Sequence, residues 1–136
     1  MFKKDDRFEQ TFVVSEKVYL SFLEIFKDLN PLHTNTEFAM NKGFKGKVMH
    51  GNILNGFLSY FVGECLPQKN VIIHSQEIQF KNPVYMQDVL NFEAIVNEVY
   101  ESVNAIEFKF QFKNDGGKIL AKGKIQIGII LDKPKS

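Results

Sequence analysis

The sequence predicts an α+β domain in which a curled antiparallel sheet of about five strands wraps around one long helix. Three observations lead to this fold class: a strand pattern near the start, an apolar helical pattern in the middle, and several strand patterns after it. The 136 residues can bury one core but are too few for two. We therefore expect a single domain over residues 1–136.

The first elements are a strand and a helix. Residues 8–14 have the β-type composition of a short strand. Ser15 offers the side-chain oxygen that an N-cap needs, so a helix is expected to start there and run to about residue 27. Pro31 is expected to stop any helix. Asn35 or the threonine after it can cap one further helical turn.

The central helix is predicted over residues 52–66. A broad arc of its helical wheel is apolar and should be buried, with Ile53, Leu54, Phe57, Leu58, Tyr60, Phe61, Val62 and Cys65. The rest of the wheel is small or polar, with Asn52, Asn55, Gly56, Ser59 and Gly63. Such a face either borders a substrate tunnel or allows a partner helix to pack closely.

Four strand patterns follow Pro67. They cover residues 71–80, 89–100, 103–113 and 118–130, with turn residues between them. We expect them to pair in chain order as a four-strand antiparallel meander. Alternation is clearest in the third segment, where four apolar side chains should face the core: Ile106, Phe108, Phe110 and Phe112.

Composition excludes several classes of function. Lys and Arg number 17 and Asp and Glu 16, so the formal charge of +1 lacks the basic excess of a nucleic-acid-binding protein. No stretch has the length and apolarity of a membrane span. Cys65 is the single cysteine and has no partner in a zinc or disulfide motif. We expect no nucleic-acid or membrane partner, no metal, and a cytoplasmic location.

Two motifs carry the chemistry. Asp28, Asn30, Pro31 and His33 place an acid, an amide and an imidazole within six residues. His50-Gly51 then opens the central helix, where a free backbone N–H can stabilise an anion. An acid/base pair facing such a helix start indicates addition or removal of water. Without the motif context, a helix-end or turn role for Asp28 and a surface-loop role for His33 would fit equally well.

These motifs resemble the MaoC-like dehydratases, also called (R)-specific enoyl-CoA hydratases, which have the hotdog fold. The resemblance covers nearly the whole chain. It rests on Asp28, Asn30-Pro31, His33, Phe38-Ala39 and His50-Gly51, with further matches at Ser59, Leu66-Pro67, Phe80-Lys81, Pro83-Val84 and Asp88.

The resemblance implies an enzyme that interconverts trans-2-enoyl and (R)-3-hydroxyacyl thioesters without a metal or redox cofactor. It makes Asp28 and His33 the paired acid and base, and Gly51 the donor to the thioester oxygen. Coenzyme A is favoured over acyl carrier protein as the carrier, because the sequence has no evident dense basic surface. The family's subunits usually pair, so a homodimer or larger homo-oligomer is expected.

Three further residues are candidates for substrate binding: Asn30, Asn52 and Ser59. Asn30 would also hold the geometry of its loop, and Ser59 could instead bond to its own helix backbone. Asn52 departs from the family pattern, in which an apolar residue commonly follows His-Gly. His50 is expected to be structural and to hold Gly51 in place.

Two rival functions fit the same fold. A hotdog acyl-CoA thioesterase would keep Gly51 as the oxyanion donor, but it usually has a carboxylate on the central helix facing the thioester. Position 59 is serine, and Glu64 lies away from the small and polar face. The other rival is a non-catalytic subunit that binds acyl thioesters, against which the intact Asp28 and His33 argue.

Overall fold

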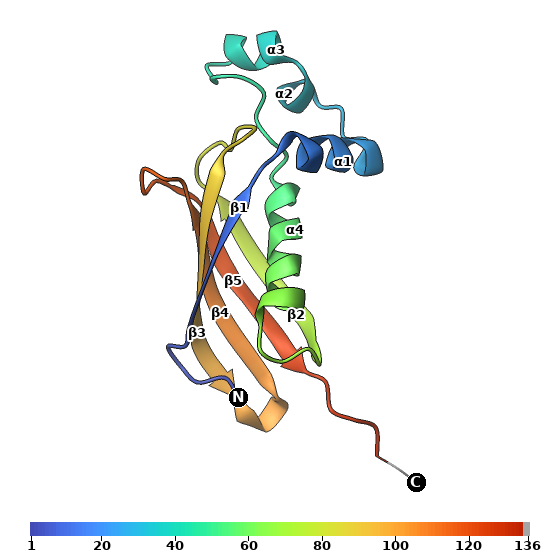
Figure 1. The fold of residues 1–136 in the computed structure, drawn as a ribbon, viewed down its shortest axis with the longest axis vertical. Helices are drawn as coiled ribbons and strands as arrows, with labels where there is room; N and C mark the ends of the chain where they lie inside the picture. The colour runs from blue at the N-terminus through green and yellow to red at the C-terminus, as the bar shows by residue number, and fades with distance from the viewer. Residues whose placement is uncertain (135–136) are drawn as a thin grey trace.

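A computed structural model describes residues 1–134, which form a five-stranded antiparallel sheet with a long helix lying along one face (Figure 1). The strand order is β1-β3-β4-β5-β2. The strands are β1 (Arg7–Val13), β2 (Val71–Phe80), β3 (Val89–Tyr100), β4 (Ala105–Lys113) and β5 (Ile119–Ile129). The predicted α+β class with a curled sheet around a helix is confirmed.

The predicted four-strand meander is wrong for β2. Strands β3, β4 and β5 pair in chain order, but β2 pairs with β5 and forms an edge of the sheet. The link from β2 to β3 therefore crosses the end of the sheet, and the N–H groups of Lys81 and Asn82 both donate to the Leu120 carbonyl. The pattern of a strand shows which face it buries but not which strand is its neighbour.

Side-chain caps position the helices before the central one. Ser15 accepts from the Val18 N–H and starts α1 (Glu16–Phe26), as predicted. Pro31 does not simply end a helix: it is the first residue of α2 (Pro31–Thr34), which Asn30 caps. Asn35 accepts from the Phe38 N–H and starts α3 (Thr36–Asn41), as predicted.

The central helix is α4 (Asn52–Tyr60), and it continues as one π-helical stretch, η1 (Phe61–Cys65). Ile53, Leu54 and Leu58 are buried against the sheet. Tyr60 was expected in the buried arc but is 50% exposed, because it lies at the margin of that arc. A short 3-10 turn, η2 (Glu101–Val103), joins β3 to β4.

The core lies between α4 and the sheet and is rich in phenylalanine. Alternate residues of β4 point into it, and Phe108 and Phe112 are fully buried while Lys109 between them is exposed. Phe61 of η1 packs edge-on against Phe108 with ring centroids 5.6 Å apart. Within residues 1–134, no helix is long and apolar enough to cross a membrane.

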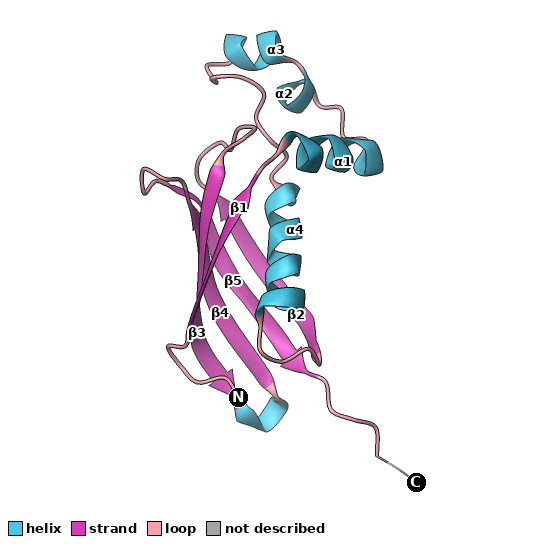
Figure 2. Ribbon diagram, viewed as in Figure 1, coloured by secondary structure: helices cyan, strands magenta, loops and turns pink. Residues whose placement is uncertain are grey.

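The segment from α1 to α3 lies beyond the first turn of α4, at one end of the sheet (Figures 1 and 2). Since the residues predicted to be catalytic lie in this segment and at the start of α4, the fold brings the two predicted motifs to the same end of the molecule.

Candidate active site

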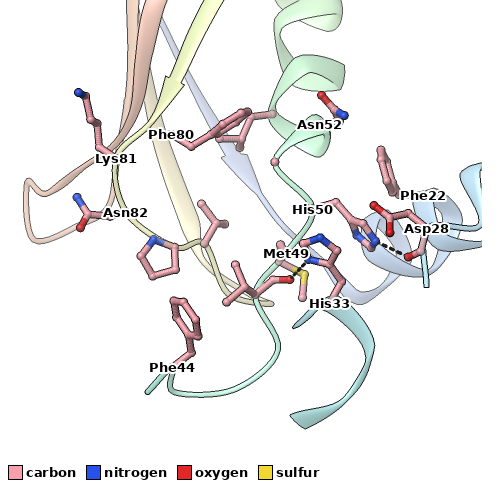
Figure 3. A pocket seen from close by; sticks show the side chains of 15 residues that line it. Phe22, Asp28, His33, Phe44, Met49, His50, Asn52, Phe80, Lys81 and Asn82 are labelled. Atoms are coloured by element: carbon pink, nitrogen blue, oxygen red, sulfur yellow. Dashed lines mark hydrogen bonds between the residues drawn. The ribbon is translucent and has the colours of Figure 1, made fainter. Parts of the chain in front are cut away.

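A pocket of about 480 Å³ lies where this segment meets the start of α4 and the link from β2 to β3. Four predicted site residues line it, namely Asp28, His33, Gly51 and Asn52. Figure 3 shows Asp28, His33 and His50 grouped on one side, with Phe80, Lys81 and Asn82 on the other. The pocket therefore brings together residues from both predicted motifs.

Two hydrogen bonds hold His33, one through its ring and one through its own carbonyl. Its Nδ1 lies 2.7 Å from the Val48 carbonyl oxygen. Because a carbonyl only accepts, Nδ1 carries the proton, and the neutral ring has its lone pair on Nε2. The Tyr19 hydroxyl donates to the His33 carbonyl at 2.6 Å. The ring is thus fixed in the tautomer that a proton acceptor at Nε2 requires.

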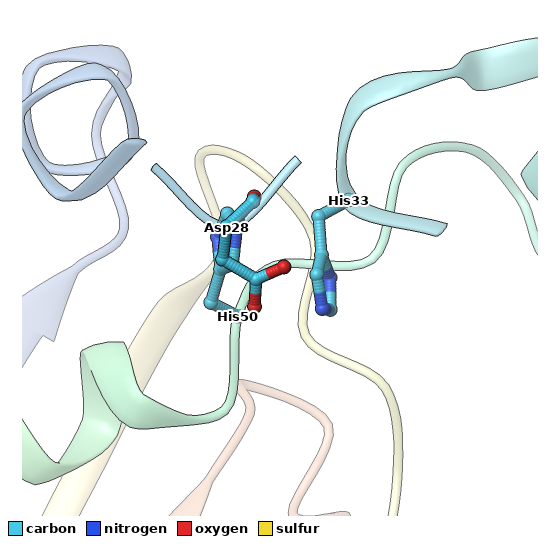
Figure 4. Close-up of side chains that lie close together, drawn as sticks. All are labelled: Asp28, His33 and His50. Carbon is cyan, nitrogen blue, oxygen red and sulfur yellow. Dashed lines mark hydrogen bonds between the residues drawn. The ribbon is translucent and has the colours of Figure 1, made fainter. Parts of the chain in front are cut away.

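Asp28 lies in the exposed loop after α1. Its Oδ1 accepts from the Asn30 N–H at 3.1 Å. Its side chain lies close to both histidines: one ligand atom from each of Asp28, His33 and His50 is within 4.8 Å of the others (Figure 4). The carboxylate and the His33 ring are therefore near enough to act on one small molecule between them.

His50 is buried, with 3% of its surface exposed. Its Nε2 donates to the Asp28 carbonyl at 2.9 Å, and its ring lies against that of His33 with centroids 4.1 Å apart. Its Nδ1 is buried, and no hydrogen-bond partner for it is found among the described residues. His50 therefore contacts both members of the predicted acid/base pair.

Gly51 immediately precedes α4. The Ile53 N–H donates to the His50 carbonyl and the Leu54 N–H to that of Gly51, whereas no partner of the Gly51 N–H is found within residues 1–134. A helix N-terminus carries a partial positive charge, so this N–H is suited to an oxyanion. A Cβ at position 51 would lie 2.9 Å from two ring carbons of Phe80. Glycine therefore also makes room for that ring.

The structure does not bring Asn30 and Ser59 to the walls of this pocket. Asn30 caps α2, its Oδ1 accepting from the Leu32 N–H at 2.9 Å. Ser59 is exposed on α4, two turns beyond Asn52. Asn30 thus holds the geometry of the loop, and direct substrate binding by either residue stays a prediction.

Two imidazoles and a carboxylate form a donor set that a transition metal can use. Here His50 Nε2 donates to a carbonyl, and His50 Nδ1 is buried. His50 therefore offers no accessible lone pair, and the donor set available from the cluster is reduced to Asp28 and His33. The absence of a metal cofactor stays a prediction.

Sequence reasoning missed Tyr19, Val48 and Phe80 as parts of the site. Tyr19 and Val48 act at 14 and 15 residues' separation from His33, and Val48 acts through its carbonyl, which side-chain identity does not reveal. Burial raises the pKa of the Tyr19 phenol, which keeps it protonated as a donor. Phe80 belongs to a segment that matched the family pattern, and this was the available signal.

Comparisons with known proteins agree with this geometry. Residues 2–113 match the family described as "MaoC like domain". The (R)-specific enoyl-CoA hydratase of Aeromonas caviae is 29% identical over 104 residues, covering 76% of this chain and 78% of that protein. A mitochondrial 3-hydroxyacyl-[acyl-carrier-protein] dehydratase of Arabidopsis thaliana is 26% identical over 127 residues, covering 91% and 75%.

Among solved structures, the (R)-hydratase from A. caviae involved in PHA biosynthesis superposes with a TM-score of 0.86 at 23% identity. The match covers 94% of this chain and 97% of that one. Likeness at this level shows the fold, so the predicted hotdog architecture is confirmed.

Proposed function

Because the chain belongs to the MaoC-like dehydratase family, we propose that it interconverts trans-2-enoyl and (R)-3-hydroxyacyl thioesters. Its relatives are named as hydratases and dehydratases, so the chain is an enzyme of the hydro-lyase class. The observation that carries the specific proposal is the pocket in which Asp28 and His33 lie together beside Gly51.

The proposed reaction needs one proton shared by Asp28 and His33. In hydration, one partner gives this proton to the α-carbon while the other takes a proton from the water whose oxygen bonds to the β-carbon. The pair then again holds one proton, on the other partner. His33 Nε2 and an Asp28 carboxyl oxygen are the two positions for this proton, and one of them carries it when the reaction starts.

The thioester oxygen gains negative charge as the water adds, because the electrons of the double bond move toward the carbonyl. We place this oxygen at the Gly51 N–H, at the start of α4. A preorganised donor at that point stabilises the enolate more than the ground-state carbonyl, which lowers the barrier.

The carrier attached to the acyl group is proposed to be coenzyme A. Lys81 lines the pocket and supplies a cation for a phosphate of the carrier. Acyl carrier protein is the alternative, because Lys109, Lys122 and Lys124 line a hollow on the outer face of the sheet, where an acidic protein could bind. Rates with crotonyl-CoA and with the crotonyl thioester of acyl carrier protein separate the two carriers. They are compared in wild type and in a Lys122→Glu/Lys124→Glu variant. A carrier-protein rate that falls in the variant while the crotonyl-CoA rate is unchanged would favour acyl carrier protein.

A thioesterase is less well supported than a hydro-lyase. The acid of the central helix, Glu64, lies in η1 at the far end from the pocket and is exposed, with Lys69 Nζ at 3.7 Å. It cannot serve as the carboxylate that hydrolysis in this fold usually requires on the helix facing the thioester.

We further propose that each copy of the chain is one domain and acts in the cytoplasm. Two copies are proposed to pair through β2. Among residues 1–134, no strand pairs with the outer side of β2, and its Ile72 and Phe80 are each 52% exposed. Pairing of the β2 edges of two copies would satisfy the backbone groups of this outer side and cover the two side chains. Light scattering at several protein concentrations tests this proposal.

The test of the activity follows the loss of enoyl-thioester absorbance when purified protein meets crotonyl-CoA. We expect Asp28→Asn and His33→Ala each to lower kcat by at least about a hundredfold, and the product to be (R)-3-hydroxybutyryl-CoA. Asp132→Asn, outside the pocket, is the matched control. Turnover that is unchanged in both variants would reject Asp28 and His33 as the acid/base pair. Loss of activity with EDTA would reject the metal-free mechanism.

A further inference from the structure

Three amide side chains form a hydrogen-bonded chain from the edge strand to the pocket. Gln76 of β2 donates through Nε2 to Asn55 Oδ1 at 2.8 Å. Asn55 in turn donates through Nδ2 to Asn52 Oδ1, also at 2.8 Å. Each link uses one nitrogen as donor and one oxygen as acceptor, so the chain has a direction.

The direction fixes the side chain of Asn52. Oδ1 of Asn52 accepts from Asn55, which fixes the orientation of the Asn52 amide. The Nδ2 group of Asn52 can therefore donate its N–H bonds to another partner. No acceptor for Asn52 Nδ2 is found among the described residues. Asn52 thus presents an oriented donor at the first position of α4.

This donor stands where two cavities meet. The catalytic pocket shares Phe22, Asp28 and Asn52 with a groove of about 770 Å³ between α1 and α4. Figure 3 shows Asn52 on the same side of the helix start as Phe22 and Asp28. The other walls of the groove are largely apolar and include Ile25, Phe26 and Phe57.

The groove lies beyond the reacting carbons. With the thioester oxygen at Gly51 and the β-carbon beside Asp28 and His33, an acyl chain continuing past Asp28 must pass Asn52 to enter the groove. A plain alkyl chain at that point would displace water from the Asn52 amide without offering a hydrogen-bond acceptor. The lost hydrogen bond would weaken binding of that chain.

We propose that Asn52 selects acyl thioesters that carry an oxygen function, such as a hydroxyl group, on a carbon beyond C3. The oxygen accepts from Asn52 Nδ2, while the remaining carbons contact the apolar walls of the groove. This inference rests on the proposed hydro-lyase function and names the class of substrate that the same site prefers. A site built to bond a substrate oxygen discriminates strongly against the analogue that lacks it.

Saturated thioesters test the inference without requiring turnover. Calorimetry would give the Kd of hexanoyl-CoA and of its 5-hydroxy and 6-hydroxy derivatives. We expect wild type to bind at least one hydroxylated thioester about tenfold or more tightly than hexanoyl-CoA. Asn52→Leu should remove or reverse this preference, and Asn55→Leu should reduce it because Asn52 loses its orientation.

Asn41→Leu, on the exposed end of α3, is the matched control and should leave the ratio of Kd values unchanged. Three outcomes would overturn the inference. Wild type could bind hexanoyl-CoA as tightly as the hydroxylated thioesters or more tightly, or bind none of the three. The third outcome is a ratio of Kd values that Asn52→Leu leaves unchanged. Hydration of crotonyl-CoA, whose chain ends at C4, is measured in parallel. Its absence alone would reject the proposed function, and the Kd ratio would still decide the role of Asn52.

Discussion

The rings of His33 and His50 lie with their centroids 4.1 Å apart, and His50 also donates to the peptide oxygen of Asp28 at 2.9 Å. One buried imidazole therefore supports both members of the proposed acid/base pair. Its contact with Asp28 is through the backbone and its contact with His33 is through the ring face, so the two can be separated by substitution.

His50→Gln and His50→Phe separate these contacts. Glutamine can keep a donor near the position of Nε2, whereas phenylalanine keeps the ring beside His33 but cannot donate to Asp28. We expect His50→Gln to stay within about tenfold of wild-type kcat and His50→Phe to lose about a hundredfold, with little change in KM. Steady-state rates on crotonyl-CoA check this, and equal rates in both variants would contradict it.

Tyr19→Phe removes the hydroxyl that donates to the His33 carbonyl at 2.6 Å. The carbonyl then loses a partner in a half-buried place, so the free energy of unfolding should fall by about 1 kcal/mol. Urea unfolding measures the loss, and kcat should also fall because α2 is held less firmly. A variant as stable as wild type would show that this bond contributes nothing.

Gly51→Ala should lower kcat/KM strongly, for one of two reasons. The new Cβ either blocks the thioester or displaces the Phe80 ring, which would lie 2.9 Å away. The double variant Gly51→Ala/Phe80→Ala removes the second cause. We expect the double variant to stay as slow as Gly51→Ala. Recovery of the rate would show that glycine serves packing alone.

Alkaline pH should destabilise the fold through Cys65. Burial raises the pKa of its thiol; Lys69 nearby lowers it and Glu64 raises it, with burial the largest effect. The folded protein thus stays protonated at a pH where the unfolded thiol, with a pKa of about 8.5, is already ionised. The contribution to stability is complete below that pH and is lost as pH rises through the folded pKa.

Urea unfolding between pH 7 and pH 10, in wild type and Cys65→Ser, measures this effect. The difference between the two proteins should change with pH only above about pH 8. A difference that is constant over the whole range would contradict the raised pKa. Alkylation of Cys65 should likewise be slow in the folded protein and fast in urea.

Local features were predictable from the sequence, and distant partners were not. The caps Ser15 and Asn35 act on N–H groups three residues away, so the sequence contains both halves of each interaction. The bounds of β2 and β3 also follow from local composition. The pairing of β2 with β5 depends on where the chain crosses the sheet, which no residue of β2 encodes.

The candidate site divides in the same way. Asp28 and His33 were identified because their spacing within one loop is a sequence property. Their support by the Val48 carbonyl and the His50 ring depends on how that loop folds back onto the start of α4. The chain of amides from Gln76 to Asn52 was also not predictable from the sequence, because its members come from two separate elements, β2 and α4.

The turn from Asp28 to His33 is restrained before any ligand arrives. Asn30 accepts from the Leu32 N–H and donates its own N–H to Asp28, and the ring of Pro31 fixes one backbone dihedral between them. Most of the conformational entropy of this turn is therefore lost during folding, not during catalysis. The spacing between the acid and the imidazole should consequently be insensitive to which acyl group occupies the pocket, so substrates of different length would differ in affinity more than in the rate of the proton transfers.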